Sequence, residues 1–191
     1  GHESEGKAGT HFTAEVVEAA GGQALKWTTL EAGASLSVRR NSRLVLNVAA
    51  DQSAVTDWTG AKELAFYVDA SGYGNNTEAP YMGLRLTTAG DNKWMPTRDV
   101  YARADGDEVW SRLVVSGNAI KLPVGFAGWV RVPLAEDNWG EAWGNSATGT
   151  FPAAPQVSRI WLIAGGMSSN AAFVDTSIVF DSFTLLSDAV R

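Results

Sequence analysis

The sequence predicts an all-β fold, an antiparallel two-sheet β-sandwich of jelly-roll type, and three observations support this class. Apolar and polar residues alternate through most of the chain, as they do in half-buried strands. Turn signals rich in Gly, Asn and Asp interrupt the alternation at short intervals, and helical periodicity is nowhere sustained. Because parallel strands would need helical crossovers, the strands are expected to pair antiparallel in two packed sheets.

The strand pattern can be followed from one end of the chain to the other. The clearest predicted strands are residues 44–49, 63–69, 81–88, 93–104, 108–115, 129–134, 159–164 and 177–186, with weaker ones at 13–18 and 24–29.

Two short segments predict tight turns between these strands. Asp105-Gly106 has the composition of a type I′ turn, which predicts a hairpin over residues 93–115. Gly90-Asp91-Asn92 would join residues 81–88 to that hairpin and complete a three-strand meander. The stretches 71–80 and 135–156 break the strand pattern, and long irregular connections of this kind are often functional.

The length and composition indicate one globular domain. The chain has 191 residues, too few for two ordinary domains, and residues 11–191 are predicted to form a single β-sandwich. Residues 1–10 are expected to be a flexible start or a cloning remnant. No disulfide, thiol nucleophile or thiolate zinc site is expected, since the sequence contains no cysteine.

Charge and hydropathy exclude two classes of partner. The formal net charge of −6 argues against nucleic acid, whose nonspecific binding needs clustered basic side chains. No apolar run approaches the roughly 20 residues of a membrane span, so no membrane association is expected. We expect a monomer that belongs to a larger secreted, extracellular or cell-surface protein.

The alternation divides each strand into a core side and an outward side. In residues 81–87, for example, Met82, Leu84 and Leu86 would face the core, which leaves Tyr81 and Arg85 outward. An aromatic residue and Arg recur at the outward positions of four strands, and the aromatic residue is Trp in three of them. The candidate ligand-binding residues there are Tyr81, Arg85, Trp110, Arg112, Trp129, Arg131, Arg159 and Trp161.

An outward face of this composition suits a carbohydrate. Sugar C–H faces stack on aromatic rings, and an Arg fork binds a carboxylate through two hydrogen bonds. The prediction requires that residues 81–87, 129–134 and 159–164 share one sheet with an open outer face. The alternative is that each Trp and Arg form a cation–π packing pair beneath covering loops.

The stretch 135–156 contains two further candidates, Trp139 and Trp143, in Gly- and Asn-rich surroundings. In one turn of helix they would share a face and act as a clamp or lid over a glycan. The alternative is that one ring lies under the loop and anchors it, and we expect one of the two to be buried.

Carboxylates suited to Ca²⁺ occur near both termini and in the stretch 135–156. Calcium binds scattered oxygen ligands, and the sequence contains no EF-hand spacing. The hypothesis is a structural Ca²⁺ held by Asp181 and an N-terminal glutamate, either Glu15 or Glu18.

Catalysis is not expected. The only histidines are His2 and His11, so a Ser-His-Asp system lacks a credible base. A glycosidase needs only two carboxylates. However, no acidic residue clearly alternates into the aromatic face, and the nearest candidates are Asp69 and Asp99. A polysaccharide lyase or glycosidase of jelly-roll form stays open as one alternative, and a structural spacer or surface interaction domain without a glycan ligand as another.

Several segments carry a family resemblance. Residues 125–134, GFAGWVRVPL, resemble a segment that recurs in secreted bacterial polysaccharide-active proteins. Residues 157–162 and 180–185 resemble the last strands of galactose-binding-like carbohydrate-binding modules, and residues 63–69 are similar to a central strand of the same modules. The resemblance implies a non-catalytic β-sandwich joined to a catalytic domain of the same parent chain, often with one structural calcium, for which Asp181 would match the ligating Asp.

Together these observations predict a carbohydrate-binding module that targets an attached enzyme to a polysaccharide. The sequence has ten Arg and five Lys. Because Arg offers planar recognition of carboxylates, the expected ligand is an acidic polymer such as xanthan or another uronate-containing polysaccharide.

Overall fold

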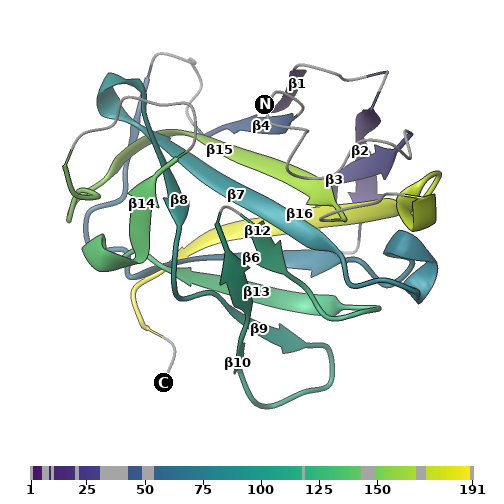
Figure 1. Ribbon diagram of the computed structural model, residues 1–191. Coiled ribbons are helices and arrows are strands. Elements are labelled where there is room, and N and C mark those ends of the chain that lie inside the picture. The colour runs from purple at the N-terminus through teal and green to yellow at the C-terminus, as the bar shows by residue number, and fades with distance from the viewer. Residues whose placement is uncertain are drawn as a thin grey trace.

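The computed structural model describes residues 2–5, 9, 11–19, 22–30, 43–48, 54–117, 119–142, 149–166 and 171–189, and for residues 2–5 the backbone alone. Within these residues the strands form two antiparallel sheets that pack face to face (Figure 1). The predicted all-β two-sheet sandwich is therefore confirmed. Among the described residues, no helix is long and apolar enough to cross a membrane.

Sheet A has β15 and β7 as its central strands (Figure 1). Its path runs in the order β1 (His2–Glu5), β4 (Arg43–Asn47), β15 (Gln156–Gly165), β7 (Tyr81–Thr88), β12 (Ala119–Lys121) and β11 (Val114–Ser116). Three short strands attach to this path: β5 (Thr56–Asp57) pairs with β15, β8 (Asn92–Pro96) with β7, and β14 (Trp139–Glu141) with β8.

Sheet B packs against sheet A. Its order is β10 (Ser111–Arg112), β9 (Tyr101–Ala104), β13 (Ala127–Pro133), β6 (Glu63–Asp69), β16 (Ser177–Leu186), β3 (Gly22–Thr29) and β2 (Phe12–Ala19). Short 3-10 helices occur at η1 (Tyr73–Asn76), η2 (Ala89–Asp91), η3 (Glu136–Asn138) and η4 (Ala171–Phe173).

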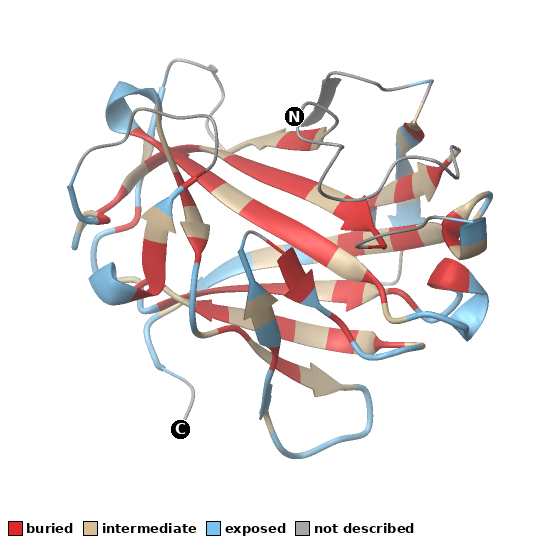
Figure 2. Cartoon of the chain, viewed as in Figure 1, coloured by how far each residue is buried: buried red, intermediate tan, exposed pale blue. Residues whose placement is uncertain are grey.

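The core fills the space between the sheets. Buried and partly exposed residues alternate along many of the strands (Figure 2), because successive side chains of a strand point to opposite faces. Phe12 stacks on Trp27 with a ring-centroid distance of 3.7 Å, and both rings are fully buried. Phe66 and Val130, neighbours on β6 and β13, are also fully buried in this core.

The predicted strands 63–69, 81–88 and 177–186 agree with β6, β7 and β16. The turn at Gly90-Asp91-Asn92 is also confirmed, since Gly90 and Asp91 have φ values of 76° and 60° and β8 folds back onto β7.

The predicted three-strand meander is wrong. The run 93–104 is divided between β8 in sheet A and β9 in sheet B, so the chain crosses between the sheets at residues 97–100. The buried side chain of Asn138 fixes this crossing, because its Oδ1 accepts the Asp99 N–H at 2.7 Å and its Nδ2 donates to the Asp99 carbonyl at 2.9 Å.

The predicted hairpin over residues 93–115 is confirmed only where β9 and β10 pair antiparallel, with Ser111 opposite Ala102. The rest of the run 108–115 and its turn differ from the prediction. Ser111–Arg112 and Val114–Ser116 belong to opposite sheets, and Val109 is 72% exposed instead of facing the core. Within Asp105-Gly106, Gly106 has a positive φ, 88°, but Asp105 does not, so the turn is not type I′. The Asp107 N–H donates to the Ala104 carbonyl at 3.0 Å, and the chain continues as a loop to β10.

Candidate functional site

The structure divides the predicted Trp and Arg face between two opposite surfaces. Strands β7 and β15 are neighbours in sheet A, where Trp161 pairs with Arg85, but β13 lies in sheet B. The prediction of one shared sheet is therefore wrong. Alternation correctly gave the outward residues, but it contains no information about which strands pair.

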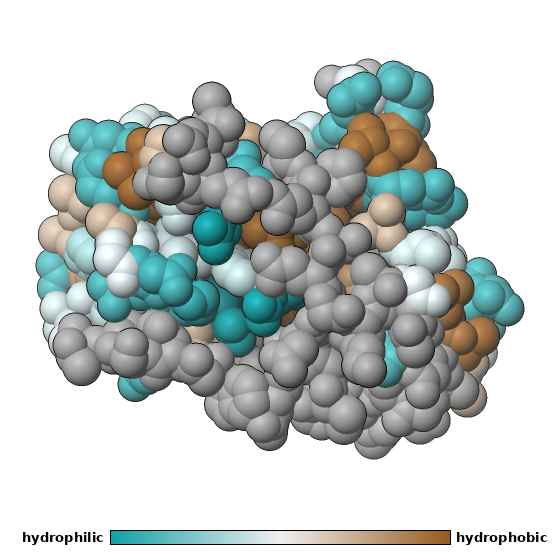
Figure 3. Space-filling model, turned by 90° about the horizontal axis from the view of Figure 1, so that it is seen from above, coloured by the Kyte–Doolittle hydropathy of each residue, from teal (hydrophilic) through white to brown (hydrophobic). Residues whose placement is uncertain are grey.

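The first surface is the outer face of sheet A. We call the side chains around its central tryptophan the Trp161 cluster, which comprises Arg43, Arg85, Thr87, Arg159 and Trp161. Their positions follow from register, since Trp161 lies opposite Arg85 and Arg159 lies opposite Thr87. Seen from above the view of Figure 1, hydrophilic and hydrophobic residues of the described part both reach the surface (Figure 3).

The Trp161 ring is not an open stacking platform, as the sequence had suggested. Its exposed fraction is 4%, although it points away from the core. The guanidinium carbon of Arg43 lies 4.0 Å from the ring centroid, and the indole N–H donates to Thr87 Oγ1 at 2.5 Å. The Trp161 ring therefore supports the Arg43 guanidinium, which it holds by a cation–π contact.

Arg85 lies in an environment that disfavours the charged form of its guanidinium. Burial, and then the nearby charge of Arg43, lower the pKa of its guanidinium. Among the described residues it has neither a carboxylate partner nor a hydrogen bond. A half-buried cation beside a second cation is unfavourable unless an anion compensates it, and such perturbed groups concentrate at functional sites.

Tyr81 and Arg159 lie at the two ends of the same face. Tyr81 pairs with Gly165 and Arg159 pairs with Asn47 and Thr87, and both side chains are partly exposed. Arg159 adds a third cation to the outer face of sheet A. The predicted residues Tyr81, Arg85, Arg159 and Trp161 therefore share one face, on which Tyr81 lies farthest from Arg159.

The second surface is the outer face of sheet B. Its aromatic and arginine side chains form the Trp110 cluster, which comprises Tyr67, Tyr101, Arg103, Trp110, Trp129 and Arg131. The guanidinium carbons of Arg103 and Arg131 each lie 5.1 Å from the Trp110 ring centroid. Trp129 and Tyr67 make an edge-to-face pair with centroids 5.8 Å apart, and both rings are partly exposed.

Two predicted ligand residues of this surface are engaged in ion pairs. Arg131 Nε binds the buried carboxylate of Glu63, and its Nη2 donates to the Asp188 carbonyl at 2.7 Å. Arg112 Nη2 lies 2.8 Å from Asp99 Oδ1. Arg131 is thereby held within the fold, whereas the Arg112 side chain is 58% exposed and its role as a ligand residue stays a prediction.

Trp139 belongs to the core and not to a lid. Its ring is buried, stacks on Phe151 with a centroid distance of 5.0 Å, and donates its indole N–H to the Pro133 carbonyl at 2.8 Å. It lies in β14 and not in a turn of helix. The expectation that one of the two loop tryptophans is buried is confirmed, and Trp143 lies outside the described residues.

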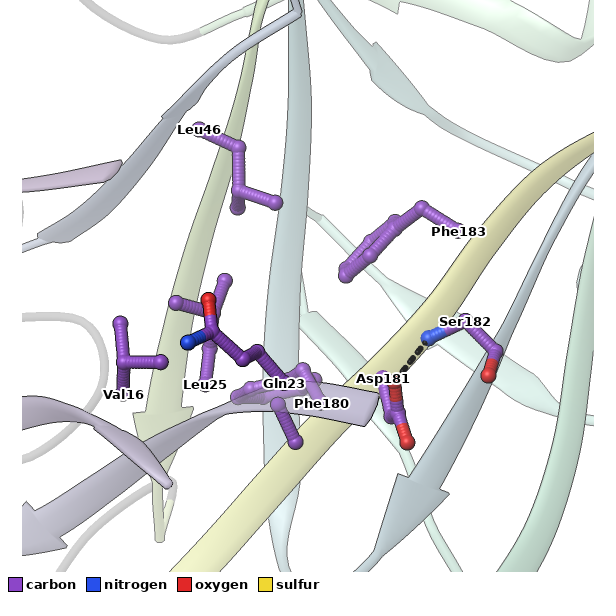
Figure 4. Close-up of a pocket in the computed structure, with 9 residues that line it drawn as sticks. Val16, Gln23, Leu25, Leu46, Phe180, Asp181, Ser182 and Phe183 are labelled. Atoms are coloured by element: carbon purple, nitrogen blue, oxygen red, sulfur yellow. Dashed lines mark hydrogen bonds between the residues drawn. The ribbon is translucent and has the colours of Figure 1, made fainter. Parts of the chain in front are cut away.

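The predicted calcium ligands are not gathered into a cluster in the described part of the chain. Glu15 forms an ion pair of 2.9 Å with Lys26, and the described residues contain no group of three His, Cys, Asp or Glu that could hold a metal. Figure 4 shows Asp181 at a pocket with apolar neighbours that include Leu46, while one of its oxygens accepts the Ser182 N–H at 2.6 Å. Calcium takes six to eight oxygen ligands, which include backbone carbonyls as well as carboxylates. A site formed by Asp181 and either Glu15 or Glu18 stays a prediction.

Tyr67 supplies a prediction about pH. A hydrogen bond to the Asp105 carboxylate, followed by burial, raises the pKa of Tyr67 to about 12. Because the folded pKa lies above the unfolded value of 10.0, the contribution of Tyr67 to stability is complete below pH 10 and disappears as the pH rises to about 12. Spectrophotometric titration should show that Asp105→Asn returns the Tyr67 pKa toward 10. An unchanged titration curve would contradict the assignment.

Two important residues were not among the predicted ligands. Arg43 was missed because the predicted strand began one residue later, at 44, although the outward alternation with Val45 and Asn47 includes it. Arg103, at an outward position of β9, was missed because the sequence pattern predicts one continuous strand over residues 93–104.

Comparison with known proteins identifies the fold of this chain but does not assign the chain to a family. No protein-family model matches the chain, and no curated protein matches it. Among solved structures the fold is that of β-sandwich carbohydrate-binding modules. The solution structure of CtCBM11, described with dynamics and binding studies, matches with a TM-score of 0.54 and 13% identity, over 100% of this chain and 90% of that one.

Two further structures match less well. The CBM22-1–GH10 modules of Clostridium thermocellum endo-1,4-β-D-xylanase 10B, complexed with xylohexaose, match with a TM-score of 0.41 and 9% identity, over 99% of this chain and 26% of that one. The CBM22-1 xylan-binding domain of Paenibacillus barcinonensis Xyn10C matches with a TM-score of 0.39 and 14% identity, over 99% and 88%.

Proposed function

We propose that this chain is a non-catalytic carbohydrate-binding module that binds an acidic polysaccharide on the outer face of sheet A. The observation that carries the proposal is Arg85, a half-buried guanidinium that lies beside Arg43 without a described counter-charge. A ligand carboxylate would relieve the repulsion between the two cations and form charge-assisted hydrogen bonds.

The rest of the cluster favours the same ligand. The Trp161 ring holds the Arg43 guanidinium in place, so less side-chain entropy is lost when an anion binds. Arg159 lies one outward position along β15 from Trp161, which suits a polymer that carries repeated acidic groups. Uronate-containing polymers such as xanthan have this property.

The resemblance and the fold support a proposal for the biological setting. A module of this kind is proposed to be secreted or displayed at the cell surface, as a monomer joined to a catalytic domain in the same parent chain. Its function would be to keep that enzyme on its substrate, because a second binding event within one chain raises the effective concentration.

Affinity electrophoresis tests the proposal. Gels that contain xanthan, alginate or pectin are expected to retard the protein, and rising salt should weaken the retardation because part of the affinity is electrostatic. Hydroxyethylcellulose is the neutral control. Retardation by the neutral glucan alone would contradict the role of the arginine cluster.

A further inference from the structure

The outer face of sheet B presents a row of side chains that the proposed function does not use. In register, Asp181 of β16 lies opposite Tyr67 of β6, Tyr67 opposite Trp129 of β13, and Trp129 opposite Arg103 of β9. With strands about 4.8 Å apart, the row is about 14 Å long. That length fits a short stretch of a glycan chain lying across the strands.

The side chains of the row include the kinds of chemical group that contact a sugar. The partly exposed Trp129 and Tyr67 rings supply apolar surface for sugar C–H groups. Arg103 has a cation–π contact with Trp110 but no hydrogen bond or ion pair with any described residue, so its N–H groups are available as donors. Asp69 and Asp181 each accept one backbone N–H through Oδ1, from Ser71 and Ser182, and a second oxygen remains in each carboxylate.

The charge of this surface differs from that of the Trp161 cluster. Asp69, Asp105 and Asp181 surround Tyr67, whereas Arg103 is the cation at the end of the row. Carboxylates repel a polyanion but accept hydrogen bonds from hydroxyl groups, which both donate and accept. The surface therefore suits an uncharged sugar better than a uronate.

We propose that the outer face of sheet B is a second carbohydrate-binding site, centred on Trp129, that takes a neutral glycan chain. The inference goes beyond the proposed function, because the two sites lie on opposite outer faces of the sandwich (Figure 1) and differ in the charge of their ligands. One molecule can then contact two separate chains, or an acidic and a neutral stretch of polysaccharide, at the same time.

Nuclear magnetic resonance titration of the whole chain tests the second site. The probes are neutral β-1,4-linked hexasaccharides of glucose, xylose and mannose, and the readout is the indole N–H resonance of each tryptophan. At least one probe is expected to shift Trp129 and Trp110 more than Trp161. The Trp129→Ala variant should weaken binding of that probe about tenfold, and Arg103→Gln should also weaken it without removing an aromatic ring.

Arg85→Gln is the matched control, because it alters the opposite face. It should leave neutral-sugar binding unchanged, while Trp129→Ala leaves retardation by alginate, which consists of uronates only, unchanged. Failure of one site is then distinguishable from failure of the other. The inference is overturned if no neutral hexasaccharide shifts Trp129, or if binding survives both sheet B variants. It is also overturned if sedimentation shows a dimer that Trp129→Ala dissociates, since a second copy would then occupy this face.

Discussion

Replacing Arg85 by Gln is expected to remove most of the affinity for an acidic polysaccharide while leaving the fold intact. The variant loses the half-buried cation that lies beside Arg43 without a described carboxylate. A hydrogen bond to a charged group contributes about 2 kcal/mol, so affinity should fall about thirtyfold. Titration calorimetry with a xanthan-derived oligosaccharide measures this loss.

The same substitution should not destabilise the protein. Burial and the Arg43 charge both disfavour the charged form of Arg85, so a neutral amide removes a repulsion from the folded state. We expect the melting temperature of Arg85→Gln to equal or exceed that of the wild type, as is common where stability is sacrificed for function.

Arg98→Gln is the control for lost positive charge. Arg98 pairs with Asp137 on the exposed surface, where its side chain is 56% exposed, and it lies outside the Trp161 cluster. The Arg98→Gln variant should bind the oligosaccharide almost as well as the wild type does. Equal losses in the two variants would show that net charge, and not the position of Arg85, determines binding.

Replacing Gly128 by Ala is expected to cause the largest loss of stability. An added Cβ would lie 2.2 Å from the Arg103 carbonyl oxygen and 2.7 Å from the Ala104 Cα. Both atoms belong to the backbone of β9, which pairs with β13 through Gly128 and Ala104, so the clash is relieved only by separating the strands. We expect a loss of about 3 kcal/mol in the free energy of unfolding.

Urea denaturation measures this effect, with Gly72→Ala as the matched control. A Cβ at the exposed Gly72 would meet no atom within 4 Å, and its φ of −112° is accessible to alanine. Gly72→Ala should therefore change the free energy of unfolding by no more than about 0.5 kcal/mol. Similar midpoints for the two variants would contradict the close approach of β13 to β9.

The sequence predicted which residues face the core in the central strands β7 and β13, although it failed for Val109. Met82 and Leu84 on β7, and Val130 and Val132 on β13, are buried as the alternation indicated. This succeeded because the side-chain period of a strand is a local property of the chain. For the same reason Trp129 and Arg131 were correctly placed outward.

The assignment of strands to sheets could not be predicted, because pairing depends on residues far apart in the chain. Trp161 binds Thr87 at a sequence separation of 74, and the crossing at residues 97–100 is fixed by Asn138, 39 residues beyond Asp99. The covered Trp161 ring has the same origin, since its partner Arg43 comes from another strand. Local patterns therefore identified Arg85, Arg159 and Trp161 of the candidate site, but neither Arg43 nor the grouping of these side chains.

The most direct test of the sheet A site is a crystal structure of the protein with a glucuronate-bearing oligosaccharide derived from xanthan. We expect a ligand carboxylate within hydrogen-bonding distance of the Arg85 guanidinium, with Arg43 still stacked on Trp161. A structure in which the uronate lies against sheet B, or contacts neither Arg85 nor Arg159, would contradict the account.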